Sequence, residues 1–85
     1  MKLRFKYYVD HFQDGYTLKV QLLIDGETSW EDPEWTVSPS SDIGPEIVNV
    51  GLSDYDDKIF QIAWVFEGDS GDINWWSIDD IEVYY

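Results

Sequence analysis

The stretch Tyr16-Thr17-Leu18-Lys19-Val20-Gln21-Leu22-Leu23-Ile24 decides the fold class. Within it apolar side chains alternate with polar ones over most of the length. Successive side chains of a β-strand point to opposite faces, so this spacing of two predicts a strand with one face in a core. The following Asp25-Gly26 is a turn signal that ends the strand.

The same kind of pattern recurs on both sides of this stretch. Alternation over residues 3–9 predicts a strand that precedes it, and apolar runs predict later strands at residues 47–52, 59–66 and 75–85. Residues 35–37 form a short strand candidate inside the proline-rich segment 27–45. Because residues 59–66 are nearly all apolar, we expect that strand to be buried on both faces. Strands separated by turns, without helices, predict an all-β sandwich.

The last predicted strand contains a break in its alternation. Ile78 has one parity, whereas Ile81 and Val83 have the other, so a regular strand cannot bury all three on one face. Either the strand is covered on both sides, or a bulge at Asp79-Asp80 shifts the phase by one residue. Either one of the two carboxylates faces solvent and the other caps or satisfies loop amides, or one of them turns inward to bind a hard cation or a neighbouring loop.

Composition excludes several classes of function. The chain has 85 residues, which is one domain at most, and no cysteine, so disulfides and thiolate metal sites are excluded. Its 18 acidic and five basic residues give a net charge of −13, which repels nucleic acid and anionic membranes. The excess carboxylates either form a solvated surface or bind divalent cations. No apolar run is long enough for membrane insertion, and no secretion signal is present in this chain.

The sequence carries no recognisable catalytic motif. There is no glycine-rich phosphate loop, no two-histidine metal motif and no nucleophile elbow. The single histidine, His11, lies in an expected loop without an evident partner and is interpreted as a surface residue. A pair of glycosidase-type carboxylates stays open in so acidic a chain. We therefore expect a protein that is not an enzyme.

Aromatic residues make up 18% of the chain and offer a second kind of site. Trp30, Trp35 and Trp75 lie in or beside expected loops, where exposed indole rings can stack on sugars. The alternative is that each packs under a loop. Trp64, within the apolar strand, is predicted to be core.

The segments Phe60–Gly68 and Trp75–Val83 together resemble the C-terminal half of MAM-like jelly-roll domains, in particular the bacterial cleaved-adhesin (choice-of-anchor J) group. The resemblance lies in an apolar strand that ends in an acidic-glycine loop, followed by an aromatic residue and Ile-Asp-Asp-Ile-x-Val. Leu18–Trp30 and Val50–Lys58 match more loosely. Members of the group are usually longer, so residues 1–85 are expected to be a single β-sandwich domain or the C-terminal part of a larger, antiparallel jelly roll.

The resemblance implies a secreted or cell-surface, non-catalytic module for adhesion or substrate binding, with a glycan or protein as its ligand. It also implies a structural calcium ion, held by Asp79 or Asp80 with Asp25 or Glu67. From the residues alone, the acidic stretches at 54–57 and 69–72 are further candidates for calcium. Two alternatives remain: a structural, self-associating domain of a larger surface protein, and a carbohydrate-binding accessory module of a hydrolase. An incomplete sandwich would leave an unpaired edge, which predicts a homo-oligomer.

Overall fold

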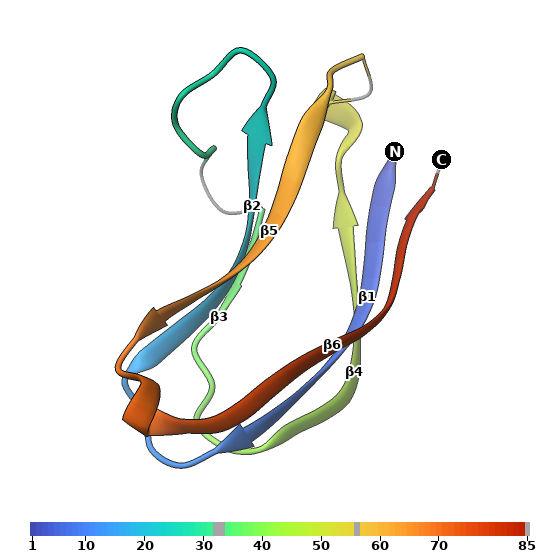
Figure 1. Ribbon diagram of the computed structural model, residues 1–85. Helices are drawn as coiled ribbons and strands as arrows, with labels where there is room; N and C mark the ends of the chain where they lie inside the picture. The colour runs from blue at the N-terminus through green and yellow to red at the C-terminus, as the bar shows by residue number, and fades with distance from the viewer. Residues whose placement is uncertain (32–33, 56, 85) are drawn as a thin grey trace.

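The computed structural model describes residues 1–31, 34–55 and 57–84 and consists of two antiparallel three-stranded sheets (Figure 1). One sheet has the order β4-β1-β6 and the other the order β3-β2-β5. The strands are β1 (Lys2–His11), β2 (Tyr16–Ile24), β3 (Trp35–Val37), β4 (Ile43–Gly51), β5 (Phe60–Gly68) and β6 (Ile73–Tyr84). Short 3-10 turns, η1 (Ser53–Tyr55) and η2 (Ser70–Asp72), precede β5 and β6. The prediction of an all-β sandwich is confirmed.

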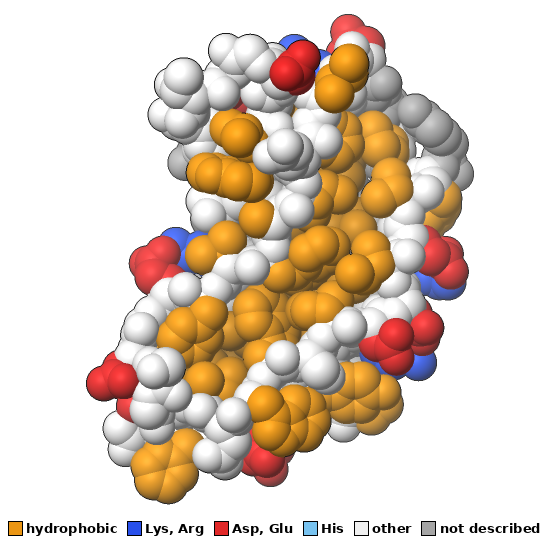
Figure 2. Space-filling view, viewed as in Figure 1, with side chains coloured by type: hydrophobic (Ala, Val, Ile, Leu, Met, Phe, Trp, Pro, Cys, Tyr) orange, Lys and Arg blue, Asp and Glu red, His pale blue; other side chains and the backbone are white. Residues whose placement is uncertain are grey.

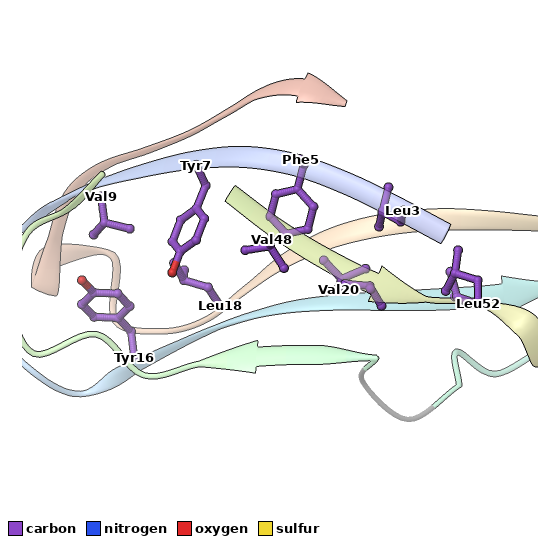
Figure 3. Close-up of a cluster of buried hydrophobic side chains, with 11 residues drawn as sticks. Leu3, Phe5, Tyr7, Val9, Tyr16, Leu18, Val20, Val48 and Leu52 are labelled. Carbon is purple, nitrogen blue, oxygen red and sulfur yellow. The ribbon is translucent and has the colours of Figure 1, made fainter. Parts of the chain in front are cut away.

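The core forms where the two central strands, β1 and β2, face each other (Figure 3). The alternating apolar residues of these strands are buried, as their spacing predicts. Phe5 is fully buried and packs edge-on against Trp35 of β3 and Trp64 of β5, at ring-centroid distances of 5.3 and 5.6 Å. β1 therefore lies over the middle of the opposite sheet.

Of the two alternatives for the last strand, the structure shows the bulge, placed at Asp80-Ile81 instead of Asp79-Asp80. Arg4 pairs with Glu82 and Lys6 pairs with Asp79, so the single residue between them on β1 faces two residues on β6. Asp80 lies in the bulge with a φ of +52°, in the left-handed region. The extra residue shifts the alternation of side chains by one position, so Val83 lies on the core-facing side opposite Leu3.

The prediction that residues 59–66 are buried on both faces is wrong. Ile59 lies outside the strand and is exposed, and β5 is an edge strand whose apolar residues are only partly buried. Among the described residues, no strand pairs with the outer edge of β5. The apolar sequence of β5 thus lacks the cover that such a composition normally has.

Within the described ranges there is no helix long and apolar enough to cross a membrane.

Candidate functional site

The two edge strands β5 and β6 border a side of the sandwich on which the apolar interior meets solvent. On the central strands the core-facing residues are buried; Leu3 and Phe5, for example, are 0% exposed. On β6 the core-facing Val83 is 49% exposed and Ile81, in the bulge, is 51% exposed. Figure 2 shows apolar side chains in a continuous band along this face. We call this surface the open side and define it as Ile62, Trp64 and Phe66 of β5 with Trp76, Ile78, Ile81 and Val83 of β6.

Among the described residues, two buried hydrogen-bond donors lie on the open side without an acceptor. They are the indole Nε1 groups of Trp64 on β5 and Trp76 on β6. A buried N–H without a partner costs roughly 1–3 kcal/mol. Both edge strands therefore carry unmet hydrogen-bonding capacity beside exposed apolar surface.

The overall dimensions fit a sandwich that is open along one side. The Cα radius of gyration is 13.6 Å, with extents of 40 × 26 × 14 Å. A compact domain of this length has a radius of gyration of roughly 12 Å. The molecule is thus a flat slab rather than a closed globule.

The structure separates the tryptophans predicted to form a glycan platform. Trp30 lies in the loop after β2, whereas Trp75 lies at the start of β6, at the opposite end of the sandwich (Figure 1). Both are exposed. The prediction is wrong for Trp35, which lies in β3 and packs against Phe5 and Tyr7 in the core. Trp64 packs against Phe5, as predicted for a core residue.

The residues nominated for calcium are not gathered either. Asp25 follows the end of β2, whereas Glu67 pairs with Thr17 near its start. Eight residues of strand separate these positions by roughly 27 Å, which excludes a shared ion. Glu67 instead forms an ion pair with Lys19.

The two adjacent aspartates of β6 remain at the surface. The Asp80 carboxylate lies 3.2 Å from the Lys6 ammonium, and the Asp79 Oδ1 accepts a hydrogen bond from the Asp80 backbone N–H at 2.8 Å. The hydrogen bond to Asp80, and then its charge, raise the pKa of Lys6. Neither carboxylate turns inward, so the surface-exposed alternative holds.

Among the described residues, no three His, Asp or Glu side chains gather in a way that could hold a metal ion. Asp56, part of one acidic stretch nominated for calcium, lies outside those residues. In the 69–72 stretch, Asp69 accepts a hydrogen bond from the Gly71 N–H, and Asp72 is buried. Calcium stays a prediction, which a thermal melt with calcium, and then with EDTA, tests.

His11 has partners that sequence reasoning missed. It is the last residue of β1, and its side chain is only 9% exposed. Its Nδ1 lies 2.7 Å from the Tyr16 hydroxyl, and its Nε2 lies 3.1 Å from the Asp14 Oδ1. Tyr16 is buried and stacks on Phe66, and this burial raises the pKa of its phenol. The interpretation of His11 as a surface residue is wrong, because the tight turn after β1 folds its near neighbours onto the ring.

Comparisons with protein-family models, with curated proteins and with solved structures found no match. The functional conclusion therefore depends on the geometry of the open side.

Proposed function

We propose that this chain is a non-catalytic binding module of a secreted or cell-surface protein, and that it binds a polypeptide partner through the open side. One observation carries the proposal: Val83, which lies opposite Leu3 on the core-facing side of β6, and Ile81 of the bulge are both about half exposed. Residues at such positions are normally covered by the opposite sheet. A partner on the open side would supply that cover.

The chemistry of the open side favours a polypeptide over a sugar. Burial of apolar surface stabilises an interface by roughly 25 cal/mol per Å². Contiguous exposed apolar surface on a soluble domain marks an interaction site more often than isolated apolar residues do. The exposed isoleucine and valine side chains have no ring face on which a sugar could stack, whereas aliphatic side chains of a partner pack well against them.

Glycan binding remains a second candidate because of the end of the sandwich where β6 begins. Trp75 and Phe12 are both exposed there, and the backbone N–H of Phe12 donates to the carbonyl of Asp72, just before β6. Exposed aromatic rings of this kind can stack on sugar rings. This candidate places the site away from Ile81.

A parallel screen of a peptide array and a polysaccharide panel tests the two candidates. Ile81→Ser shortens an exposed side chain of the open side, and Ile47→Ser is its matched control, because Ile47 is 59% exposed on β4, the other edge of the same sheet. We expect peptide binding to be weakened by Ile81→Ser and retained with Ile47→Ser and Trp75→Ala. Binding of polysaccharides alone, lost with Trp75→Ala, would refute the proposal and favour the glycan site.

A further inference from the structure

The backbone of β5 presents unpaired hydrogen-bonding groups at the open side. The Asp25 N–H donates to the Ile59 carbonyl at 2.8 Å, so the backbone of residue 59 points toward β2. β5 then pairs with β2 without a register shift from Phe60 to Gly68. Because backbone groups alternate between the two edges of a strand, the N–H and C=O groups of Phe60, Ile62, Trp64 and Phe66 point to the free edge. These groups form a regular template for a further strand.

Of the two edges at the open side, β5 is the one without features that block strand pairing. Natural edge strands are protected by charges, prolines or bulges. β6 has such protection, with a bulge at Asp80-Ile81 and a charged residue at Glu82. From Phe60 to Phe66, β5 has no charge, no proline and no bulge.

A strand beyond β5 also fits the position of the exposed core-facing residues. β6 follows β5 through the short η2 turn, so the two edge strands lie on the same side of the sandwich (Figure 1). A fourth strand in the β3-β2-β5 sheet would extend that sheet across from β6 and cover Ile81 and Val83. It would also bring carbonyl acceptors to the side on which the Trp64 and Trp76 N–H groups have none.

The charge of the chain decides between a second copy and a different partner. The net charge is −13, and three of the five basic residues, Arg4, Lys6 and Lys19, already form ion pairs with carboxylates of this chain. A second copy would add a further net charge of −13 to the assembly. The negative electrostatic potential that repels a second copy attracts a positively charged partner.

We propose that the free edge of β5 binds an extended, positively charged segment of a different polypeptide, which adds to the sheet as a fourth strand. This inference rests on the proposed function and specifies its mode of binding. Backbone hydrogen bonds supply general affinity in this mode, and alternate apolar side chains of the segment pack on the open side.

A designed peptide serves as the probe. It has nine residues, the length of β5, and valine or isoleucine alternates with lysine or threonine. One control peptide has glutamate in place of each lysine, and another is N-methylated at alternate residues so that one edge cannot donate. We expect the basic peptide to slow amide hydrogen exchange at Phe60, Ile62, Trp64 and Phe66, and both control peptides to bind at least roughly tenfold more weakly.

The protein variants refine the same experiment. Ile81→Ser is expected to lower the affinity for the basic peptide about fivefold, because about half of the isoleucine side chain is exposed and can be buried by the peptide. Ile47→Ser should leave its affinity unchanged. Absence of binding at about 1 mM peptide, or equal binding of the N-methylated peptide, would overturn strand addition.

Two further outcomes would each overturn the inference in a distinct way. Protection of the same four amides in the protein alone at about 0.05 M salt, with the mass of a dimer, would identify a second copy as the occupant. Binding that depends on Ile81 without protection of these amides would leave the proposed function standing and exclude β5 as the template.

Discussion

Gly44 is a residue at which the fold leaves no room for a side chain. A Cβ atom there would lie 2.7 Å from Tyr8 Cδ1 and 2.9 Å from Tyr8 Cα, and the φ of Gly44 is +126°. Gly44→Ala is expected to lower the free energy of unfolding by about 2–3 kcal/mol. Gly51, in the same strand, is the matched control, because a Cβ there meets nothing within 4 Å. Urea unfolding followed by tryptophan fluorescence measures both; equal losses would contradict the steric explanation.

Two tyrosines make stability depend on alkaline pH. Burial, and then the charge of Glu46, raise the pKa of Tyr7 to about 12, and a hydrogen bond to Glu34 raises that of Tyr55 to about 12. An unfolded tyrosine titrates near pH 10. Between roughly pH 10 and 12 the unfolded chain therefore loses these protons first, so stability is complete below about pH 10 and falls as the pH rises.

Tyr7→Phe tests this pH dependence. For the buried Tyr7, the fall in unfolding free energy approaches roughly 1.4 kcal/mol per pH unit. The variant should lose that contribution, so its unfolding free energy should fall less steeply than that of the wild type in urea titrations at about pH 9, 10 and 11. Parallel slopes for the two proteins would show that Tyr7 does not titrate differently in the folded and unfolded states.

At the scale of whole elements, the bulge of β6 depends on the unusual backbone of Asp80. Its φ of +52° suits glycine, asparagine or aspartate and opposes a β-branched residue. Asp80→Val should lower the unfolding free energy by about 1–2 kcal/mol. Asp80→Gly also removes the exposed ion pair with Lys6, yet should change stability by less than about 0.5 kcal/mol. Thermal melts of the two variants separate backbone strain from loss of the ion pair. Equal losses of stability in both variants would assign the cost to the ion pair.

Local alternation was sufficient to predict the strands but not the surroundings of each strand. Spacing of two located β1 and β2 closely, and the parity change between Ile78 and Ile81 located the bulge. The exposure of β5 could not be predicted, because it depends on which strands lie beside it. Trp35 was misassigned for a similar reason: its core partner Phe5 is 30 residues away in sequence and meets it only across the sandwich.

The candidate site was harder to predict than the fold because it consists of positions that lack neighbours. An unpaired edge was expected from the resemblance to longer domains, but its place on β5 depends on the register with β2. The ion pairs of Asp80 with Lys6 and of Glu67 with Lys19 likewise form only because of the register between neighbouring strands. Carboxylates that read as metal ligands in the sequence thus neutralise lysines on the outer faces of the sheets.

For the molecule as a whole, two opposing features meet on one small domain. The open side favours association, since Ile81 and Val83 would be buried by any second copy that docks there. The net charge of −13 opposes it, because each copy repels the next. The balance should therefore depend on ionic strength.

Salt should shift this balance in a predictable direction. The screening length falls from about 10 Å at 0.1 M salt to about 3 Å at 1 M, so repulsion between two copies is nearly lost while apolar attraction persists. We expect a monomer at about 0.05 M sodium chloride and a growing dimer fraction at about 1 M, measured by light scattering after gel filtration. Ile81→Ser should reduce the dimer fraction and Ile47→Ser should not, because only the first lies on the open side. A dimer that is already complete at low salt would mean that charge does not keep the copies apart, and a monomer at both concentrations would mean that the open side is too small to associate with itself.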